Sequence, residues 1–350
     1  MPAICARAHN QGMAQQTQQT EVFSSALVPV AAPELPAWVD RQLYPFVPKR
    51  FATREGVLRY VDEGRGSPIV LVHGTPSWSF EWRAVIAALR SSHRVIAPDH
   101  LGFGLSDKPR QGAYRPADHA RRLLALFDAL DLRDVTLVVH DFGGPIGLPI
   151  ALERSERVRS VVVLNSWLWP LGGDPRVARI SRFVGSALGR FLYTQLNASP
   201  RWLLPASFAR RERLPAAVHR QYLAPFARRD ERVAPWMLGR ELVGSDDYYA
   251  RLWSAREPLA NKPLTLVWGQ KDPAFGAKEL ERWQQAFPHA AVQLLKDVGH
   301  FPQEEAAQAV IAAIRNAQRP TSDQPVRQSV KAEGLLELSV RASARPGRHQ

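Results

Sequence analysis

The sequence predicts an α/β fold in which a mostly parallel, doubly wound sheet carries a set of helices inserted between two of its strands. From Phe51 onward, short apolar runs of strand length alternate with amphipathic helical segments. This alternation is typical of a parallel sheet covered by helices on both faces. Between Asn165 and Arg256 it stops, and Trp, Arg, Leu and Pro with helical periodicity take its place. The interruption predicts an all-helical cap.

The expected strands are the short apolar runs, and the expected helices lie between them. We expect strands at residues 57–64 (an edge strand), 68–74, 93–99, 135–141, 160–166, 264–272 and 291–300. We expect helices at residues 79–90, 117–132 and 303–317. Ligands bind at the carboxyl ends of the strands in such a sheet, so the site is expected where those ends meet the cap.

The chain divides into four expected parts. Residues 1–36 form a disordered leader, in which glutamines stand where a signal peptide needs an apolar segment and Met13 is an alternative start. Residues 37–165 and 257–318 form the α/β core, and residues 166–256 form the helical cap. Residues 319–350 form a basic, mobile tail rich in Ser, Pro and Arg.

The composition indicates a soluble cytoplasmic protein. Hydrophobic residues make up 45% and charged residues 23% of the 350 residues, as in ordinary globular chains. Cys5 is the one cysteine, so no internal disulfide is possible. The net charge of +13 comes mostly from arginines between Leu171 and Arg256. We interpret them as a solvated face and expect no nucleic-acid partner, no membrane partner, and a monomer or weak homo-oligomer.

Three ionisable residues follow predicted strands in an order typical of one kind of catalytic site. Asp141 follows the strand at 135–140, Asp272 the strand that begins at Leu264, and His300 the last strand. Nucleophile, acid and histidine in this chain order are typical of the α/β-hydrolase fold. Each residue alone also suits a helix cap or a turn. Together they favour a triad, and Gly143 leaves room for a tight strand-to-helix turn.

Two backbone N–H groups are expected to form an oxyanion hole beside Asp141. They belong to Thr75, which follows a buried strand, and to Phe142. Four tryptophans make the surroundings aromatic: Trp78, Trp82, Trp167 and Trp169. The sequence has no metal-ligand spacing and no dinucleotide fingerprint, so we expect neither a metal nor a cofactor.

Residues from Phe51 to about Ala317 resemble the haloalkane dehalogenases of the α/β-hydrolase superfamily. The motifs that carry the resemblance are "VHGTPSWSFEWR", "APDHLGFGLSDKP", "VVHDFGGPIGL", "LNSWLWP", "LVWGQKDPAFG" and "DVGHFPQEEA". The resemblance implies a small halogenated hydrophobic substrate and water as reactants. It also implies an alkyl ester on Asp141, which His300, oriented by Asp272, hydrolyses to an alcohol, a halide and a proton.

An aspartate suits this reaction for an elementary reason. A serine must lose a proton as it attacks and needs its histidine at once. An aspartate, with a reference pKa of about 3.9, is already ionised at neutral pH. It can therefore displace a leaving group from a saturated carbon without a base, and the histidine is needed only for the hydrolysis of the ester.

The sequence departs from the family at the halide-binding positions. The family holds the departing halide with two side-chain N–H donors, one of them usually a tryptophan directly after the nucleophile. The positions of the two donors are here Phe142 and Thr75, and a phenylalanine offers only the positive edge of its ring to an anion. The substitute donors that we consider are Trp78, Trp167, Trp169 and Trp202.

Three alternative functions stay open at this point. An epoxide hydrolase would use the same triad with two tyrosines of the cap, for which the candidates are Tyr193, Tyr222, Tyr248 and Tyr249. A haloacid would bind its carboxylate to arginines of the cap. A non-catalytic ligand-binding protein on the same scaffold is the third alternative, because a fold does not fix a function.

Overall fold

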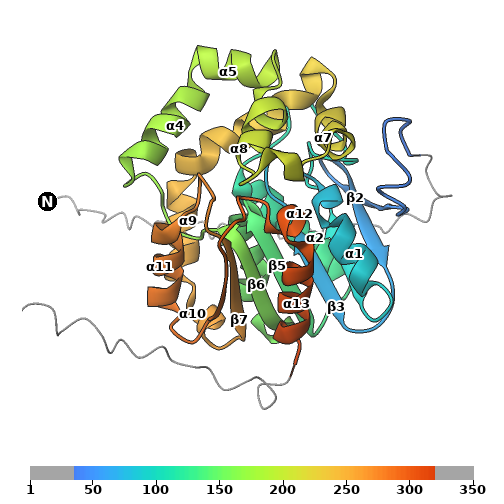
Figure 1. Ribbon diagram of the computed structural model, residues 1–350, viewed down its shortest axis with the longest axis vertical. Coiled ribbons are helices and arrows are strands. Elements are labelled where there is room, and N and C mark those ends of the chain that lie inside the picture. The colour runs from blue at the N-terminus through green and yellow to red at the C-terminus, as the bar shows by residue number, and fades with distance from the viewer. Residues whose placement is uncertain (1–34, 320–350) are drawn as a thin grey trace, which may run out of the picture.

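An eight-stranded sheet forms the centre of the computed structural model, which describes residues 35–319 (Figure 1). The expected leader and tail lie outside this range, except for residues 35, 36 and 319. The strand order is β1-β2-β4-β3-β5-β6-β7-β8. The strands are β1 (Lys49–Thr53), β2 (Gly56–Glu63), β3 (Pro68–Val72), β4 (Arg94–Pro98), β5 (Val135–Asp141), β6 (Val158–Ser166), β7 (Leu264–Gly269) and β8 (Ala291–Leu295).

The sheet is parallel from β4 to β8, and β2 runs antiparallel to both of its neighbours, β1 and β4. The prediction of a mostly parallel sheet is therefore confirmed. The prediction of an edge strand at residues 57–64 was wrong, because β1 pairs with the outer side of β2. Only one side chain of β1 is buried, Phe51, so this short strand has little of the apolar pattern that identifies the others.

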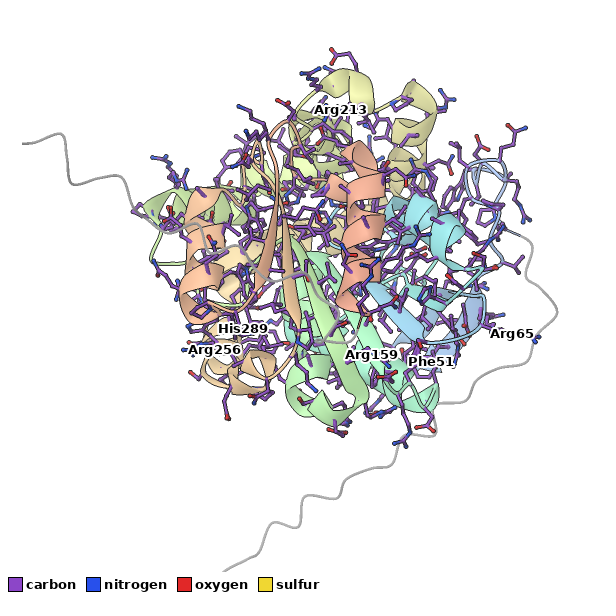
Figure 2. All side chains as sticks on the ribbon, turned by 60° about the horizontal axis from the view of Figure 1, so that its bottom comes forward. Phe51, Arg65, Arg159, Arg213, Arg256 and His289 are labelled. Carbon is purple, nitrogen blue, oxygen red and sulfur yellow. The ribbon has the colours of Figure 1, made fainter. Side chains whose placement is uncertain are left out.

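Helices cover both faces of the sheet. The central strand β5 is buried along its whole length, as expected for a strand with helices on both sides. Val139 packs in one hydrophobic cluster with α2 and α3, while Val138 packs in the other with α1 and α13. Side chains fill the space between these layers, whereas Arg65 and Arg159 lie at the periphery (Figure 2). These helices are α1 (Arg83–Leu89), α2 (Pro116–Ala129), α3 (Gly143–Glu153) and α13 (Ala307–Ala317).

The expected helices of the core differ from the observed ones in detail. The helix expected at 79–90 begins as the 3-10 turn η1 (Ser79–Trp82) before α1. The helix expected at 303–317 is split at Ala306 into α12 (Pro302–Glu305) and α13. Further core elements are η2 (Ser155–Arg157) and α11 (Ala277–Ala286). Pro149 lies inside α3, and nothing in the structure gives it a functional role.

The segment between β6 and β7 contains helices and no strand. In Figure 1 its helices α4, α5, α7 and α8 lie above one end of the sheet. We call the segment from α4 to α9 the helical insertion. Its elements are α4 (Pro175–Gly185), α5 (Ala187–Thr194), η3 (Ser199–Leu203), α6 (Leu204–Ala206), η4 (Arg211–Arg213), α7 (Ala216–Leu223), η5 (Ala224–Phe226), η6 (Arg229–Arg232), α8 (Val233–Gly244) and α9 (Asp246–Ser254), followed by α10 (Glu257–Ala260). No helix within residues 35–319 is long and apolar enough to cross a membrane.

A buried ion pair joins the helical insertion to the core. Glu304 of α12 accepts hydrogen bonds from the guanidinium of Arg83, one of them at 2.7 Å. It also accepts a hydrogen bond from the hydroxyl of Tyr222, which lies on α7 of the insertion. Burial works against the charge of Arg83, but the carboxylate of Glu304 raises the pKa of this arginine. The carboxylate therefore ties α1, α12 and α7 together.

We expect Glu304→Gln to destabilise the protein by about 3 kcal/mol, because it leaves the buried charge of Arg83 without its partner. Urea unfolding of the purified protein measures the change. The matched control is Asp134→Asn, which removes the carboxylate of an exposed ion pair with Arg159. It should lower the free energy of unfolding by about 1 kcal/mol or less. Equal losses in the two variants would contradict a structural role for the buried pair.

Candidate active site

A sharp turn at the end of β5 presents the side chain of Asp141. This residue has a φ of 52°, in the left-handed region that residues with a side chain rarely adopt. The helix α3 begins two residues later at Gly143. A Cβ on Gly143 would lie 2.3 Å from the carbonyl oxygen of Val72, so only glycine lets the helix start so close to β3. The room expected at Gly143 is thus confirmed.

The three residues of the expected triad lie together and are buried. The Nδ1 atom of His300 is 2.8 Å from Oδ2 of Asp272, and its Nε2 atom is 3.5 Å from Oδ2 of Asp141. His300 therefore has a carboxylate at each ring nitrogen. Within residues 35–319, no group of three or more His, Cys, Asp or Glu side chains is arranged to hold a metal ion.

The two carboxylates set the charge of the histidine. Burial alone would lower the pKa of His300, but Asp272 and Asp141 raise this pKa to about 10. Burial alone would also raise the pKa of Asp141, but its hydrogen bond to His300 and the charge of that ring hold it below its usual value. At neutral pH the site therefore holds an ionised Asp141 next to a protonated His300.

Both expected oxyanion donors face the carboxyl group of Asp141. The backbone N–H of Thr75 donates to Oδ1 of Asp141 at 2.8 Å. The backbone N–H of Phe142 also forms a hydrogen bond that lowers the pKa of Asp141. A Cβ on Gly74 would lie 2.3 Å from this Oδ1 atom, so a glycine before Thr75 is required for the approach. Oδ1 therefore accepts from the N–H of Thr75, whereas Oδ2 faces His300.

Asn165 supports the triad, and we did not predict its role from the sequence. Its side-chain amide donates to Oδ2 of Asp272 at 2.8 Å, and its Oδ1 atom accepts from the backbone N–H of Gly269, also at 2.8 Å. The backbone N–H of Ala274 donates to the other oxygen of Asp272 at 2.7 Å. These contacts fix the carboxylate that orients His300. The signal that could have indicated this role is the position of Asn165, a polar residue directly after the apolar run at 160–164.

A second buried group supports the backbone of the histidine. The Nε2 atom of His140 donates to the carbonyl oxygen of His300 at 2.7 Å. The Nδ1 atom of His140 lies 3.3 Å from Oε1 of Glu81 and 3.0 Å from the side-chain amide of Gln303. Glu81 lies in η1, and its side chain is buried. No motif in the sequence indicated that this carboxylate lies beside His140.

The candidate tryptophans differ in what their N–H groups contact. Trp167 lies against Phe142, with ring centroids 4.8 Å apart, and its buried Nε1 atom has no hydrogen-bond partner among the described residues. The N–H of Trp78 donates to a backbone carbonyl of α7 at 3.0 Å. Trp169 packs against two other tryptophans at 5.1 and 5.4 Å, and Trp202 is about half exposed. Of these four, Trp167 is the one with a buried, unpartnered donor beside Phe142.

The four candidate tyrosines are mostly engaged away from Asp141. The hydroxyl of Tyr222 donates to Glu304, and those of Tyr248 and Tyr249 donate to backbone carbonyls at 2.9 and 2.6 Å. Tyr193 differs, because burial and then the charge of Asp141 raise its pKa to about 12. The structure therefore offers one tyrosine, Tyr193, whose hydroxyl interacts with the charge of Asp141, rather than a pair, and this hydroxyl is itself hydrogen-bonded to Ser199.

The fold and the site have counterparts among known proteins. A sequence model of the alpha/beta hydrolase fold matches residues 67–307. Haloalkane dehalogenase 2 of Mycobacterium tuberculosis is 38% identical over 279 residues, which cover 79% of this chain and 96% of that protein. The cis-3-alkyl-4-alkyloxetan-2-one decarboxylase of Shewanella oneidensis is 33% identical over 290 residues, 78% of this chain and 89% of that protein.

Solved structures agree with the sequence comparisons. The structure of an ancestral haloalkane dehalogenase superposes with a TM-score of 0.67 at 26% identity, covering 76% of this chain and 99% of that one. A haloalkane dehalogenase from Agrobacterium tumefaciens superposes with a TM-score of 0.68 at 26% identity, covering 77% and 96%. The predicted fold is thus confirmed. The chain belongs to the α/β-hydrolase fold family and, within it, to the haloalkane dehalogenases, and it is a hydrolase.

Proposed function

We propose that the protein hydrolyses the carbon–halogen bond of a small hydrophobic haloalkane through an alkyl ester on Asp141, with the helical insertion as the cap over the site. The arrangement of the Asp141 carboxyl group carries this proposal. Its Oδ1 atom accepts a hydrogen bond from the N–H of Thr75, and its Oδ2 atom faces His300. One oxygen is therefore held for a developing negative charge, while the other is placed to attack carbon.

In the first step, Oδ2 of Asp141 displaces the halide from the substrate carbon. The attacking electron pair forms the new carbon–oxygen bond, and the halide leaves with the electrons of the broken bond. The low pKa of Asp141 keeps the nucleophile ionised. No base takes part in this step, which is compatible with a protonated His300.

In the second step, the formation of the ester itself turns His300 into a base. The ester removes the negative charge of Asp141, which is one of the groups that raise the pKa of His300. The pKa then falls and the imidazolium releases its proton to solvent, which is the proton among the products. The neutral imidazole then takes a proton from water, which attacks the ester carbonyl. The N–H groups of Thr75 and Phe142 stabilise the charge on Oδ1. Collapse breaks the bond between the carbonyl carbon and the alkyl-bearing oxygen, which takes the proton from the imidazolium and leaves as the alcohol. The carboxyl group of Asp141, now with one oxygen from water, returns its proton to His300 and is again a carboxylate.

We assign the halide-binding N–H to Trp167. Phe142 has no donor in its side chain, whereas the indole N–H of Trp167 is buried, unpartnered in the described part of the chain and next to the Phe142 ring. A buried donor without a partner carries a desolvation cost that a bound halide removes. The donor has thus moved from the position after the nucleophile to the residue after β6.

The same site supports a second candidate function, the decarboxylation of a cis-3,4-dialkyloxetan-2-one. Two observations favour it: the 33% identity to a decarboxylase of that name, and a phenylalanine where the dehalogenases usually have a halide donor. Incubation of the wild-type protein with a bromoalkane and, separately, with such a lactone distinguishes the two. Bromide release supports the dehalogenase, and release of an alkene with carbon dioxide supports the decarboxylase.

His300→Ala should trap the alkyl ester, because the first step needs no base and the second does. Incubation at a pH of about 8 or above keeps Asp141 ionised without the imidazolium. Mass spectrometry of the variant after incubation with a bromoalkane should show one added alkyl group, and peptide mapping should place it on Asp141. The double variant Asp141→Asn/His300→Ala is the matched control and should stay unmodified. A His300→Ala variant that stays unmodified and yet turns over the bromoalkane at the wild-type rate would contradict this order of steps.

Trp167→Phe should lower kcat/KM for a bromoalkane about ten- to a hundredfold, the effect of losing one buried hydrogen bond to an anion. Inhibition by added bromide should weaken in parallel. Trp169→Phe is the matched control, because that indole packs among other tryptophans, and it should change neither value. Phe142→Trp should instead strengthen bromide binding. Equal effects of the Trp167 and Trp169 variants would rule out the assignment.

The titration of His300 should depend on the charge of Asp141. NMR of ¹⁵N-histidine-labelled wild-type protein should show the imidazole losing its proton at a pH of about 10. Asp141→Asn imitates the neutral ester and removes a stabilising negative charge, so the midpoint should fall by about one to three units. The exposed Asp131→Asn is the control. A midpoint that does not move would show that the ester cannot create the base in this way.

A further inference from the structure

Large apolar side chains are exposed on one part of the helical insertion. Among the described residues, nine large hydrophobic side chains are exposed, and seven of these lie between residues 180 and 203. The seven are Ile180, Phe183, Leu188, Phe191, Leu196, Trp202 and Leu203. The other two, Val47 and Leu294, are exposed on the surface of the α/β core, outside the helical insertion. Scattered exposed side chains are ordinary, but a concentration of this kind marks an interaction surface.

Four of these residues form two pairs, each on one exposed face of a helix. Ile180 and Phe183 are three residues apart on α4, and Leu188 and Phe191 are three apart on α5, so each pair lies on one face of its helix. All four are between 48% and 57% exposed. Figure 1 shows α4 and α5 on the outer side of the insertion, away from the sheet. These helices present apolar side chains to solvent.

Arginines accompany the apolar side chains, and the acidic residues at the edge of this region, Asp174 and Asp230, already pair with basic side chains. Residues 175–211 contain seven arginines and no Asp, Glu or Lys. Arg179 and Arg182 are exposed and form no ion pair within the described part of the chain. We call the outward side of α4 and α5, with Arg179, Ile180, Arg182, Phe183, Leu188 and Phe191, the basic–apolar surface.

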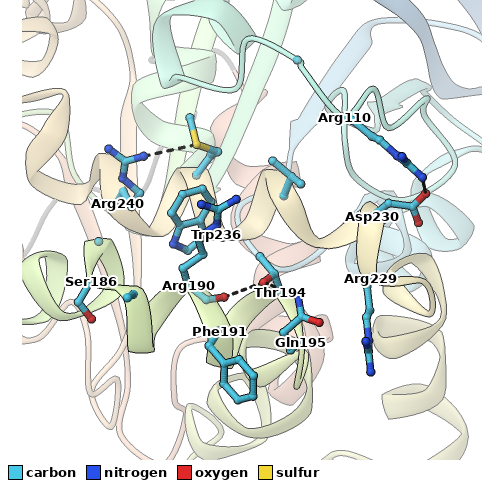
Figure 3. Close-up of a pocket in the computed structure, with 15 residues that line it drawn as sticks. Arg110, Ser186, Arg190, Phe191, Thr194, Gln195, Arg229, Asp230, Trp236 and Arg240 are labelled. Carbon is cyan, nitrogen blue, oxygen red and sulfur yellow. Dashed lines mark hydrogen bonds and ion pairs between the residues drawn. The ribbon is translucent and has the colours of Figure 1, made fainter.

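A pocket of about 1060 Å³ continues this surface between α5 and α8. Figure 3 shows Arg190 and Phe191 entering it from α5, and Trp236 and Arg240 from α8. The guanidinium groups of Arg190 and Arg240 each lie 5.1 Å from the ring centroid of Trp236. Arg110, Arg229 and Asp230 also line the pocket, and Asp230 forms an ion pair with Arg110, so arginines outnumber the one carboxylate. The pocket therefore adds an aromatic side chain and further positive charge beside the exposed apolar helices.

The combination of charge and apolar side chains fits one kind of occupant. Arginines attract the anionic head groups of a bilayer, while aliphatic and aromatic side chains enter the boundary between head groups and acyl chains. A second copy of this chain would place arginines against arginines, which repel each other. A nucleic acid would neutralise the arginines, but it would give the aliphatic side chains of α4 and α5 no apolar environment.

We propose that the basic–apolar surface docks this protein on an anionic phospholipid bilayer, with α4 and α5 lying along the membrane surface. This proposal departs from our sequence-based expectation of no membrane partner. It goes beyond the proposed reaction, because docking is measured without turnover. Docking would turn the side of the insertion away from the sheet toward the phase in which hydrophobic substrates dissolve.

Cosedimentation of the full-length protein with vesicles tests the proposal. Vesicles containing about 30% phosphatidylglycerol should pellet the wild type at a salt concentration of about 50 mM, and phosphatidylcholine vesicles should pellet much less. Salt at about 0.5 M should weaken the binding. Arg179→Glu/Arg182→Glu should lower the partition coefficient about tenfold or more, and Phe183→Ser/Phe191→Ser should lower it as well.

The matched controls change the same kinds of residue elsewhere on the protein. Val47→Ser/Leu294→Ser and Arg65→Glu/Lys296→Glu should bind vesicles like the wild type, with thermal unfolding showing that every variant is folded. If the α4 and α5 variants bind vesicles as strongly as the wild type, the proposal is overturned and another part of the chain must contact the membrane. A wild-type dimer that these variants dissociate, with no vesicle binding, would overturn it in favour of a second copy.

Discussion

The position of one imidazole between two carboxylates is the interaction on which the rest of the site depends. His300 carries a proton in the free protein because Asp272 and Asp141 both stabilise the imidazolium. The same proton keeps the nucleophile ionised in a buried site, where burial alone would favour the neutral acid. Asn165 and His140 support the two partners of this interaction other than Asp141. They hold the acid and the backbone of the histidine in place.

The sequence predicts the residues whose role follows from their place on the sheet. Asp141, Asp272 and His300 stand at the ends of apolar runs, and parallel strands bring such ends together without any knowledge of side-chain packing. Glu81 has no such signal, because it lies in a short turn of helix and its position behind His140 depends on how α1 and α12 pack. The pairing of β1 escapes prediction for a similar reason, since its partner strand, not its own pattern, holds it.

The halide donor that we propose, Trp167, illustrates how one function could be supplied from different positions in the same fold. The rings of Phe142 and Trp167 lie edge to face, so the residue after the nucleophile and the residue after β6 border the same space. An indole N–H from either position can therefore reach a halide in that space, provided that the residue at the other position is a smaller, apolar one. The sequence left four tryptophans as candidates. Only their hydrogen-bond partners separate them, and these come from distant segments.

The helical insertion has two sides under different physical constraints. On the side toward the core, the hydroxyls of Tyr222 and Tyr248 donate to Glu304 and to the carbonyl oxygen of Pro145, so that side is held in one arrangement over the carboxyl ends of the strands. On the outer side, apolar and arginine side chains are exposed to water, and packing does not account for their identity. Stability alone would allow polar residues there. An exposed apolar surface that costs solubility and adds little to folding is best explained by something that it binds.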